Sequence, residues 1–221
     1  MGFRTLSVGL GIAAVLVFTT GLADREWREI PYKKFHAAFS SVKPLDGARY
    51  IRLSRMVETS APDMSLDDVR MVIGAAAGDI EVPIGPDGTL EFPMNASLVE
   101  ENPPVRVNVP EGQLSVSMTI DTVAPPAERF PYSFVGDVAD EYRLFVKQQG
   151  LLARMTAPDM KGLALVFTAG EPALATIDAP AGETLRADEH GRLVLPLRPE
   201  WIGAEVVLSR IADAVEPVFE D

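Results

Sequence analysis

The 221-residue sequence contains no cysteine, so no thiol can act as a nucleophile or metal ligand and no disulfide can stabilise the fold. Basic residues are also few, with 20 Lys and Arg against 32 Asp and Glu, and the formal net charge is −12 at pH 7. Binding to nucleic acid or to anionic lipid is helped by a basic surface. The composition therefore argues against nucleic-acid partners and disfavours adsorption to anionic lipid.

The motifs that mark common enzyme classes are missing as well. The chain has no nucleophile elbow, glycine-rich phosphate loop, His-Glu-x-x-His helix, calcium-binding loop or dinucleotide fingerprint. Its two histidines, His36 and His190, limit Ser-His-Asp chemistry to two positions. These absences favour a protein that is not an enzyme and that uses neither a cofactor nor a metal. Asp and Glu are plentiful, so a carboxylate-dependent hydrolase acting on envelope glycans is the alternative.

The N-terminal segment has the layout of a secretory signal peptide. Arg4 precedes an uncharged apolar run from Leu6 to Phe18, and Gly21 and Ala23 stand at the −3 and −1 positions of a small-x-small cleavage site. The alternative is a retained anchor, but the apolar run is shorter than the ~20 residues that a membrane-spanning helix needs. We therefore expect residues 1–23 to be removed, leaving a periplasmic or secreted protein without a membrane span.

Short sequence matches recur in the same order about a hundred residues apart. The matched pairs are IPY (30–32) with FPY (130–132), SAPDM (60–64) with TAPDM (156–160), and DGTLEFPM (87–94) with HGRLVLPL (190–197). Their order predicts a tandem duplication, with a first repeat unit over 24–121 and a second over 131–221. The stretch 122–130, which contains Pro125 and Pro126, is the predicted linker.

Each predicted unit begins with an amphipathic helix and continues with short strands. Apolar residues at helical spacing predict helices over 32–42 and 134–146, and the second is expected to stop at Gly150. The strand candidates are 50–57, 69–73, 80–84, 90–94, 105–109 and 114–120 in the first unit, and 151–155, 163–168, 173–177, 192–197, 204–208 and 215–219 in the second. Segments 105–109 and 114–120 alternate apolar and polar residues, which predicts a half-buried antiparallel hairpin. The predicted fold is mainly β, with two related sandwich-like units each covered by one helix, and α+β is the alternative.

The signal-like N-terminus, the repeated Pro-Tyr and APDM segments, and the pair GTLEFPM and GRLVLPL together resemble uncharacterised periplasmic domain-of-unknown-function families of proteobacteria. This resemblance implies a periplasmic location and a β-rich fold. It transfers no active residue to the chain.

Candidate binding residues come mainly from the second unit. Asp188 and His190 lie in the turn DEHG, where the alternative to ligand binding is a solvated turn. Trp201, in RPEWIG, is a candidate binding aromatic whose alternative is packing in the core. Asp63 and Asp159, from the two APDM segments, are expected to stabilise turns. The sequence therefore predicts a non-enzymatic binding or interaction protein of the cell envelope, whose partner is an envelope protein or a glycan.

Overall fold

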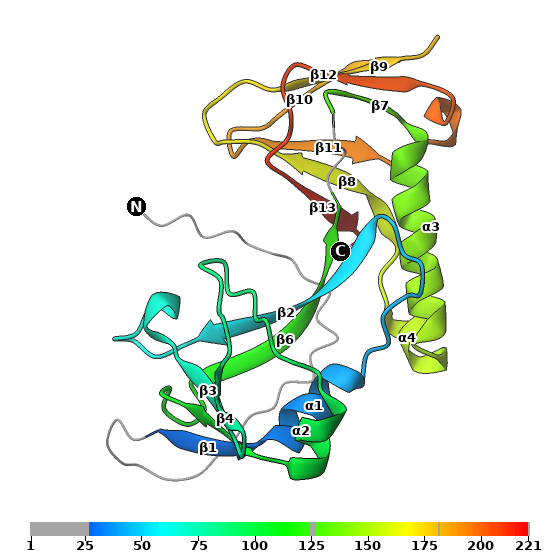
Figure 1. Cartoon of the computed structure of the whole chain (residues 1–221). Helices are drawn as coiled ribbons and strands as arrows, with labels where there is room; N and C mark the ends of the chain where they lie inside the picture. Colours follow the sequence, from blue (N-terminus) through cyan, green and yellow to red (C-terminus); the bar gives the residue numbers. More distant parts are fainter. Residues whose placement is uncertain (1–26, 124–126, 181, 221) are drawn as a thin grey trace. The chain divides into compact units, whose positions relative to one another are not determined.

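A computed structural model describes residues 27–123, 127–180 and 182–220 (Figure 1). The predicted signal peptide, 1–23, lies outside the described residues, as does part of the predicted linker. Strands arranged in antiparallel ladders hold more of the described chain than helices do, so the predicted mainly β class is confirmed.

The chain forms two compact units, and each unit is made of two separate stretches of the sequence. Unit 1 contains the described residues up to Lys43 and then Leu53–Thr119. Unit 2 contains Pro44–Arg52 and the described residues from Ile120 onward. The chain therefore contributes a short segment to unit 2 before it completes unit 1.

Unit 1 is built on a four-stranded antiparallel sheet with the order β1-β5-β3-β4. Its strands are β1 (Arg28–Pro31), β5 (Pro104–Val107), β3 (Met71–Ala75) and β4 (Gly78–Glu81). A separate pair is formed by β2 (Ile51–Thr59) and β6 (Leu114–Thr122), and Thr89 bridges to Met56 of β2. The helical elements are α1 (Tyr32–Ser40), η1 (Leu66–Asp68) and α2 (Ala96–Glu101).

The core of unit 1 forms around the apolar face of α1. Tyr32, Phe35 and Phe39 fall at helical spacing and are buried. The ring of Phe92 lies 5.3 Å from the ring centroid of each of these three residues. Because each aromatic ring buries a large apolar area, this four-ring cluster accounts for much of the packing of α1.

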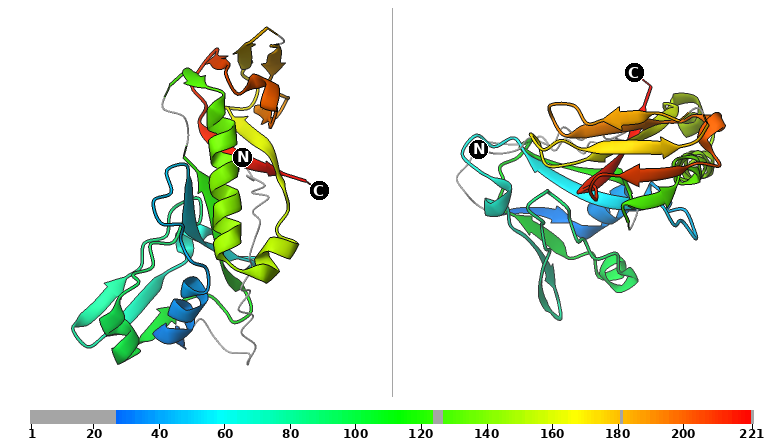
Figure 2. Two further views of the ribbon diagram at one scale, coloured as in Figure 1. Left: turned by 90° about the vertical axis from the view of Figure 1, so that its right-hand side faces the viewer. Right: turned by 90° about the horizontal axis from the view of Figure 1, so that it is seen from above.

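Unit 2 contains a four-stranded sheet with the order β10-β9-β12-β7 and a three-stranded sheet with the order β11-β8-β13. The strands are β7 (Arg129–Pro131), β8 (Met160–Val166), β9 (Leu174–Asp178), β10 (Thr184–Arg186), β11 (Arg192–Pro196), β12 (Glu205–Leu208) and β13 (Ala214–Phe219). The helical elements are α3 (Ser133–Gln148), α4 (Leu151–Thr156) and η2 (Pro199–Trp201). The views in Figure 2 show β8 and β13 running side by side, as their ladder requires.

Both four-stranded sheets follow the same plan. In each sheet the first strand, β1 or β7, lies at one edge. The strand beside it, β5 or β12, comes late in the sequence of its unit. A helix follows the edge strand directly, and its leading tyrosine makes the same pair of hydrogen bonds in both units. Tyr32 Oη donates to Pro93 O at 2.6 Å and accepts from Asn95 N at 3.0 Å. Tyr132 Oη donates to Pro196 O and accepts from Arg198 N at 3.2 Å.

Helix α3 also holds the segment Pro44–Arg52. The carboxylate of Glu141 accepts hydrogen bonds from the backbone N–H groups of Arg49, Tyr50 and Ile51 at 2.8, 2.9 and 3.2 Å. At the last residue of α3, Gln148 Nε2 donates to Pro44 O at 3.0 Å. Since bonds to a charged acceptor are stronger than neutral ones, these contacts explain why this segment belongs to unit 2.

The predicted hairpin between 105–109 and 114–120 is wrong, although both segments are strands. β5 pairs with β1 and β3, whereas β6 pairs with β2. The alternating pattern correctly shows that each strand has one buried face, but it does not say which strand lies beside it.

Two other predicted strands are not strands. Residues 151–155 form most of α4, because Leu, Ala, Arg and Met all favour helix and so short a mainly apolar segment does not distinguish helix from strand. Segment 90–94 forms no strand, and the local pairing is limited to single bridges at Leu90 and at the preceding Thr89. Pro93 has no N–H for a ladder, and Phe92 packs against α1 instead.

The two APDM segments occupy different places in the fold. Residues 61–64 follow β2 and lead into η1, whereas 157–160 follow α4 and lead into β8. Their similarity in sequence therefore does not mark one structural position. The Pro-Tyr segments before α1 and α3 do mark one position, because both lead from an edge strand into a helix.

Candidate functional site

His36 lies half-exposed on α1 beside Ser40. The hydroxyl of Ser40 lies 3.4 Å from His36 Nδ1, one helical turn away, and the imidazole stands 5.9 Å from the ring of Tyr32. A catalytic arrangement would also need a carboxylate on the imidazole. Among the described residues, the histidine that lies near a carboxylate is His190 and not His36. The contacts of His36 are therefore local ones on its own helix.

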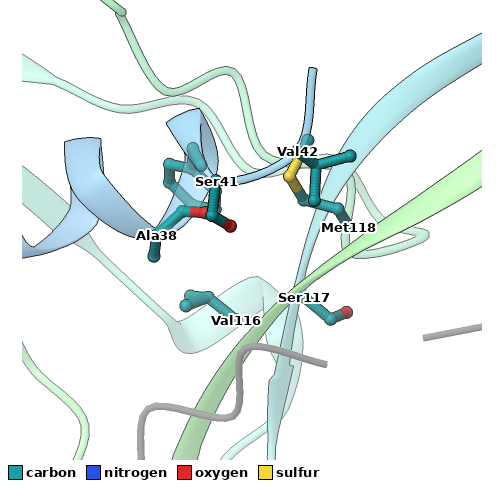
Figure 3. Close-up of a pocket in the computed structure, with 7 residues that line it drawn as sticks. Ala38, Ser41, Val42, Val116, Ser117 and Met118 are labelled. Carbon is teal, nitrogen blue, oxygen red and sulfur yellow. The ribbon is translucent and has the colours of Figure 1, made fainter. Parts of the chain in front are cut away.

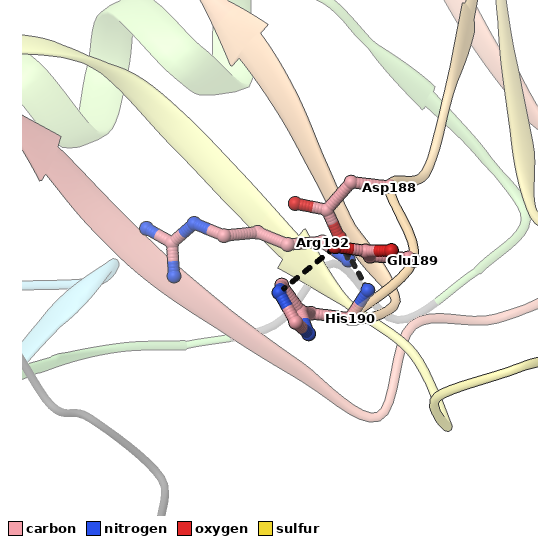
Figure 4. A network of polar contacts seen from close by, with 4 residues as sticks. All are labelled: Asp188, Glu189, His190 and Arg192. Atoms are coloured by element: carbon pink, nitrogen blue, oxygen red, sulfur yellow. Dashed lines mark hydrogen bonds and ion pairs between the residues drawn. The ribbon is translucent and has the colours of Figure 1, made fainter.

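The turn that contains Asp188 and His190 is held by its own carboxylate (Figure 4). Asp188 Oδ1 accepts from the backbone N–H groups of His190 at 2.9 Å and Arg192 at 2.8 Å. The side chains of Glu189 and His190 are exposed, with Oε1 and Nε2 3.6 Å apart. This geometry gives Asp188 a turn-closing role and leaves His190 in solvent, which supports the solvated-turn interpretation.

Trp201 is buried. It is 1% exposed, its ring meets the ring of Tyr132 edge-on at 5.3 Å, and the guanidinium of Arg198 lies 4.5 Å from its centroid. An indole enclosed in this way favours packing over ligand binding. The residues predicted for binding also do not meet, because the Asp188 turn precedes β11 and Trp201 follows it, and an extended strand rises about 3.3 Å per residue.

Two carboxylates of unit 1, Asp68 and Asp87, are stabilised in their charged form. The hydroxyl and backbone N–H of Ser65 lower the pKa of Asp68, and the backbone N–H and hydroxyl of Thr89 lower the pKa of Asp87. A glycosidase acid needs a raised pKa. Asp63 and Asp159 are exposed, and neither carboxylate accepts a hydrogen bond from the described residues, so the predicted turn-capping bonds are absent there. Within the same described part, no cluster of His, Asp and Glu suits a metal ion.

A small hollow opens on unit 1 between the end of α1 and β6 (Figure 3). Its lining residues are Ala38, Phe39, Ser41, Val42, Val116, Ser117 and Met118. Ser41 Oγ already donates to Ala38 O at 2.6 Å. Ligand sites place several convergent polar groups in a concave apolar pocket. Among the described residues that line this hollow, the only hydroxyls are those of Ser41 and Ser117, and the first is already bonded within its own turn, so this hollow is not a built ligand site.

The feature of unit 2 that lacks a structural explanation is an apolar surface on α4, which we call the α4 corner. It consists of Leu151, Leu152 and Met155, which are 71%, 76% and 75% exposed. Spacings of three and four residues place Leu152 and Leu151 on the same helix face as Met155. No residue of α4 is buried. Clustered exposed apolar side chains of this kind mark interaction surfaces more often than single ones do.

The α4 corner has a basic setting in an acidic protein. Residues 142–158 contain Arg143, Lys147 and Arg154 but no Asp or Glu. Arg143 is paired with Asp140 at 2.6 Å on α3. Lys147 and Arg154 are exposed and form no ion pair with the part of the chain that the structure describes. Two available positive charges therefore flank the apolar side chains.

The α4 corner is held in place by the end of α3. Gly150, with φ of +105°, lies between the two helices, where a left-handed conformation is easy for glycine. Tyr142 Oη donates to Pro158 O at 3.1 Å, just beyond α4. Burial raises the pKa of Tyr142 to about 12, with a further contribution from Asp159, so the hydroxyl keeps the proton that it donates. The corner is thus presented from a fixed position on unit 2.

Comparison with protein families gives a match. The family model described as "Protein of unknown function (DUF2987)" matches residues 26–167, which is more than half of the chain. The chain belongs to this family. No curated protein and no solved structure matches it.

The region shared with the DUF2987 family includes α3 and the α4 corner. Asp188, His190 and Trp201 lie outside it. In this DUF2987 protein, no helix of the described residues is long and apolar enough to cross a membrane.

Sequence reasoning missed the α4 corner because it predicted a strand over 151–155. The available signal was the stretch between Tyr142 and Pro158, where adjacent leucines follow a glycine and the charged residues are all basic. Composition along the chain, more than periodicity, would have separated this segment from the acidic remainder.

Proposed function

We propose that this DUF2987 protein is a non-enzymatic binding protein of the cell envelope, and that it binds through the α4 corner. The observation that carries the proposal is the exposure of Leu151, Leu152 and Met155 by 71–76% on one face of one short helix. Burying an aliphatic side chain stabilises a complex by about 1.5–3 kcal/mol before the costs of association. Burial of three such side chains therefore provides a large favourable free energy of binding to a partner that covers them.

The partner presents an apolar surface. The sequence suggested an envelope protein or a glycan, and glycans are small-molecule-like ligands held in concave sites with aromatic walls and precise polar groups. The α4 corner offers aliphatic and thioether side chains and no aromatic ring. Its chemistry supports a protein or lipid partner over a glycan.

Export and duplication belong to the same proposal. The signal-like segment 1–23 delivers the protein to the periplasm or the exterior. Duplication of an ancestral unit is supported by the common strand order of the two four-stranded sheets and by the matching bonds of Tyr32 and Tyr132. The basic, apolar α4 has no counterpart directly before β2 in unit 1. The binding surface is thus specific to one unit.

Site-specific photo-crosslinking tests this function. A photoreactive amino acid at position 152, in cells that naturally make the protein, is expected to give a defined crosslinked product with an envelope component. The matched control is position 202, because Ile202 is also an exposed aliphatic residue of unit 2, at 57%. Equal yields at the two positions, or no product at 152, would refute binding through the α4 corner.

A further inference from the structure

We propose that the α4 corner inserts into the anionic surface of a lipid bilayer. This inference rests on the proposed function and names its partner. Leu151, Leu152 and Met155 would enter the boundary between headgroups and acyl chains, and Lys147 and Arg154 would lie at the level of the lipid phosphates. The protein would then be a peripheral membrane protein whose contact is one short helix.

The apolar part of the surface fits a bilayer. Helices that lie in the interface bury an apolar face to a depth of about 5–10 Å and keep basic residues beside the headgroups. In α4 the apolar residues share one face, while Arg154 and the preceding Lys147 are exposed. None of these side chains is needed for the core of unit 2, so the protein loses no packing when they enter lipid.

The local charge also fits an anionic surface, although the net charge of the chain does not. Over residues 142–158 the formal charge is positive, whereas the whole chain carries −12. Charges separated by more than the Debye length of about 8 Å at physiological salt are largely screened. The bilayer therefore interacts mainly with the charged groups nearest the corner, which are Lys147, Arg154 and, just beyond α4, the exposed Asp159. Repulsion by the acidic remainder of the chain grows as salt is lowered. Binding is expected to be reversible, because a single anchoring signal gives marginal affinity.

A second copy of the chain fits this surface less well. Each of the exposed aliphatic side chains offers on the order of 100 Å², and the corner therefore falls well below the roughly 800 Å² that each partner buries in a standard interface. Two copies meeting here would also bring Lys147 and Arg154 close to their own counterparts. Charge complementarity favours phosphate headgroups over another copy of the same basic segment.

Vesicle flotation with the purified chain from Asp24 onward tests the proposal. This form retains every helix and strand of the described residues, the first of which is Trp27. The protein is expected to float with phosphatidylcholine vesicles that contain phosphatidylglycerol and to remain in solution with phosphatidylcholine alone. Replacing the corner by L151S/L152S/M155S is expected to abolish flotation. The matched variant I202S/I211S, which removes exposed aliphatic residues elsewhere in unit 2, is expected to float like the wild type.

A pair of charge variants tests whether lipid binding depends on the charge near the α4 corner or on the net charge of the chain. The variant K147Q/R154Q is expected to weaken binding by about fivefold for each charge removed. The variant R129Q/K161Q has the same net charge but removes exposed basic residues that are already paired with Glu205 and Glu220, and it is expected to bind within about twofold of the wild type. Circular dichroism of each variant shows whether it is folded, and α4 contributes no buried side chain whose loss would unfold it.

Three results would overturn the lipid proposal. The first is that the protein does not float with vesicles that contain phosphatidylglycerol. The second is that K147Q/R154Q and R129Q/K161Q lose the same amount of lipid affinity. The third is a dimer in sedimentation experiments that the L151S/L152S/M155S variant abolishes. If flotation fails while position 152 still crosslinks to an envelope protein, the proposed binding function stands and its partner is a protein. Loss of both the flotation and the crosslink removes the proposed function as well.

Discussion

Replacing Trp201 with alanine is expected to lower the free energy of unfolding by about 3–5 kcal/mol, as large-to-small substitutions of buried aromatic residues do. The indole is 1% exposed, and its removal leaves a cavity against Tyr132 and under the guanidinium of Arg198. The loss would also free Tyr132, whose hydroxyl links the start of α3 to Pro196 and Arg198. Urea unfolding followed by far-ultraviolet circular dichroism measures the change without relying on tryptophan fluorescence.

The neighbouring residue provides the control for Trp201. Ile202 is 57% exposed, and Ile202→Ala is expected to change the free energy of unfolding by no more than about 0.5 kcal/mol. If Trp201→Ala were as mild as Ile202→Ala, the indole would not be a core residue. The interpretation of Trp201 as a binding aromatic would then regain its support.

Replacing Gly191 with alanine is expected to lower the free energy of unfolding by about 2–6 kcal/mol through two separate effects. Gly191 has φ of +78°, where a Cβ is strained by about 1–3 kcal/mol. A Cβ at this position would also overlap the carbonyl oxygen of Phe167, whose own N–H donates to Gly191 O at 2.8 Å. Relieving such an overlap shifts backbone between β8 and β11, and overpacking of this kind costs about 1–3 kcal/mol more.

Gly170 separates the two effects, and Gly88 extends the test to unit 1. Gly170 has a similar φ of +83° but open space around its Cβ position, so Gly170→Ala should show the strain alone. Gly88 has φ of +88° and would place a Cβ 2.6 Å from Val57 O, and its own carbonyl accepts from Val57 N at 2.8 Å. We therefore expect Gly88→Ala to resemble Gly191→Ala in chemical denaturation. If Gly191→Ala and Gly170→Ala cost the same, the close approach to Phe167 is not real.

Local patterns in the sequence were enough to predict most of the elements. Apolar spacing located α1 and α3, and turn residues with alternating apolar positions located β2, β3, β5, β6, β8, β9, β11, β12 and β13. These signals are local, because a helix or strand shows its buried face in its own periodicity. The mainly β class followed from them.

Pairing and long-range contacts could not be predicted in the same way. The turn after β5 leads into a strand of a different pair, since β6 pairs with β2, which precedes it by more than fifty residues. The placement of Pro44–Arg52 depends on Glu141 and Gln148, about ninety to a hundred residues later. Nothing in the local composition of either segment announces these contacts.

The candidate site residues show the same difference between features that local sequence predicts and features that depend on long-range contacts. The DEHG turn was recognisable from its residues, and Asp188 does close it through backbone N–H groups. The enclosure of Trp201 depends on Tyr132, which lies far from it in sequence. The α4 corner was hidden for the opposite reason, because apolar residues are normally buried and exposure is visible only in three dimensions.

Single-cysteine labelling measures most directly whether the α4 corner is covered by a partner in the cell. The chain has no cysteine, so one introduced at position 152 is the sole thiol, and positions 190 and 202 provide exposed controls. Binding through the corner predicts that a maleimide labels position 152 several-fold more slowly in cells than in the purified protein, while 190 and 202 react alike in both. Equal rates in cells and in solution at position 152, or slowing at 190 in its place, would contradict the account.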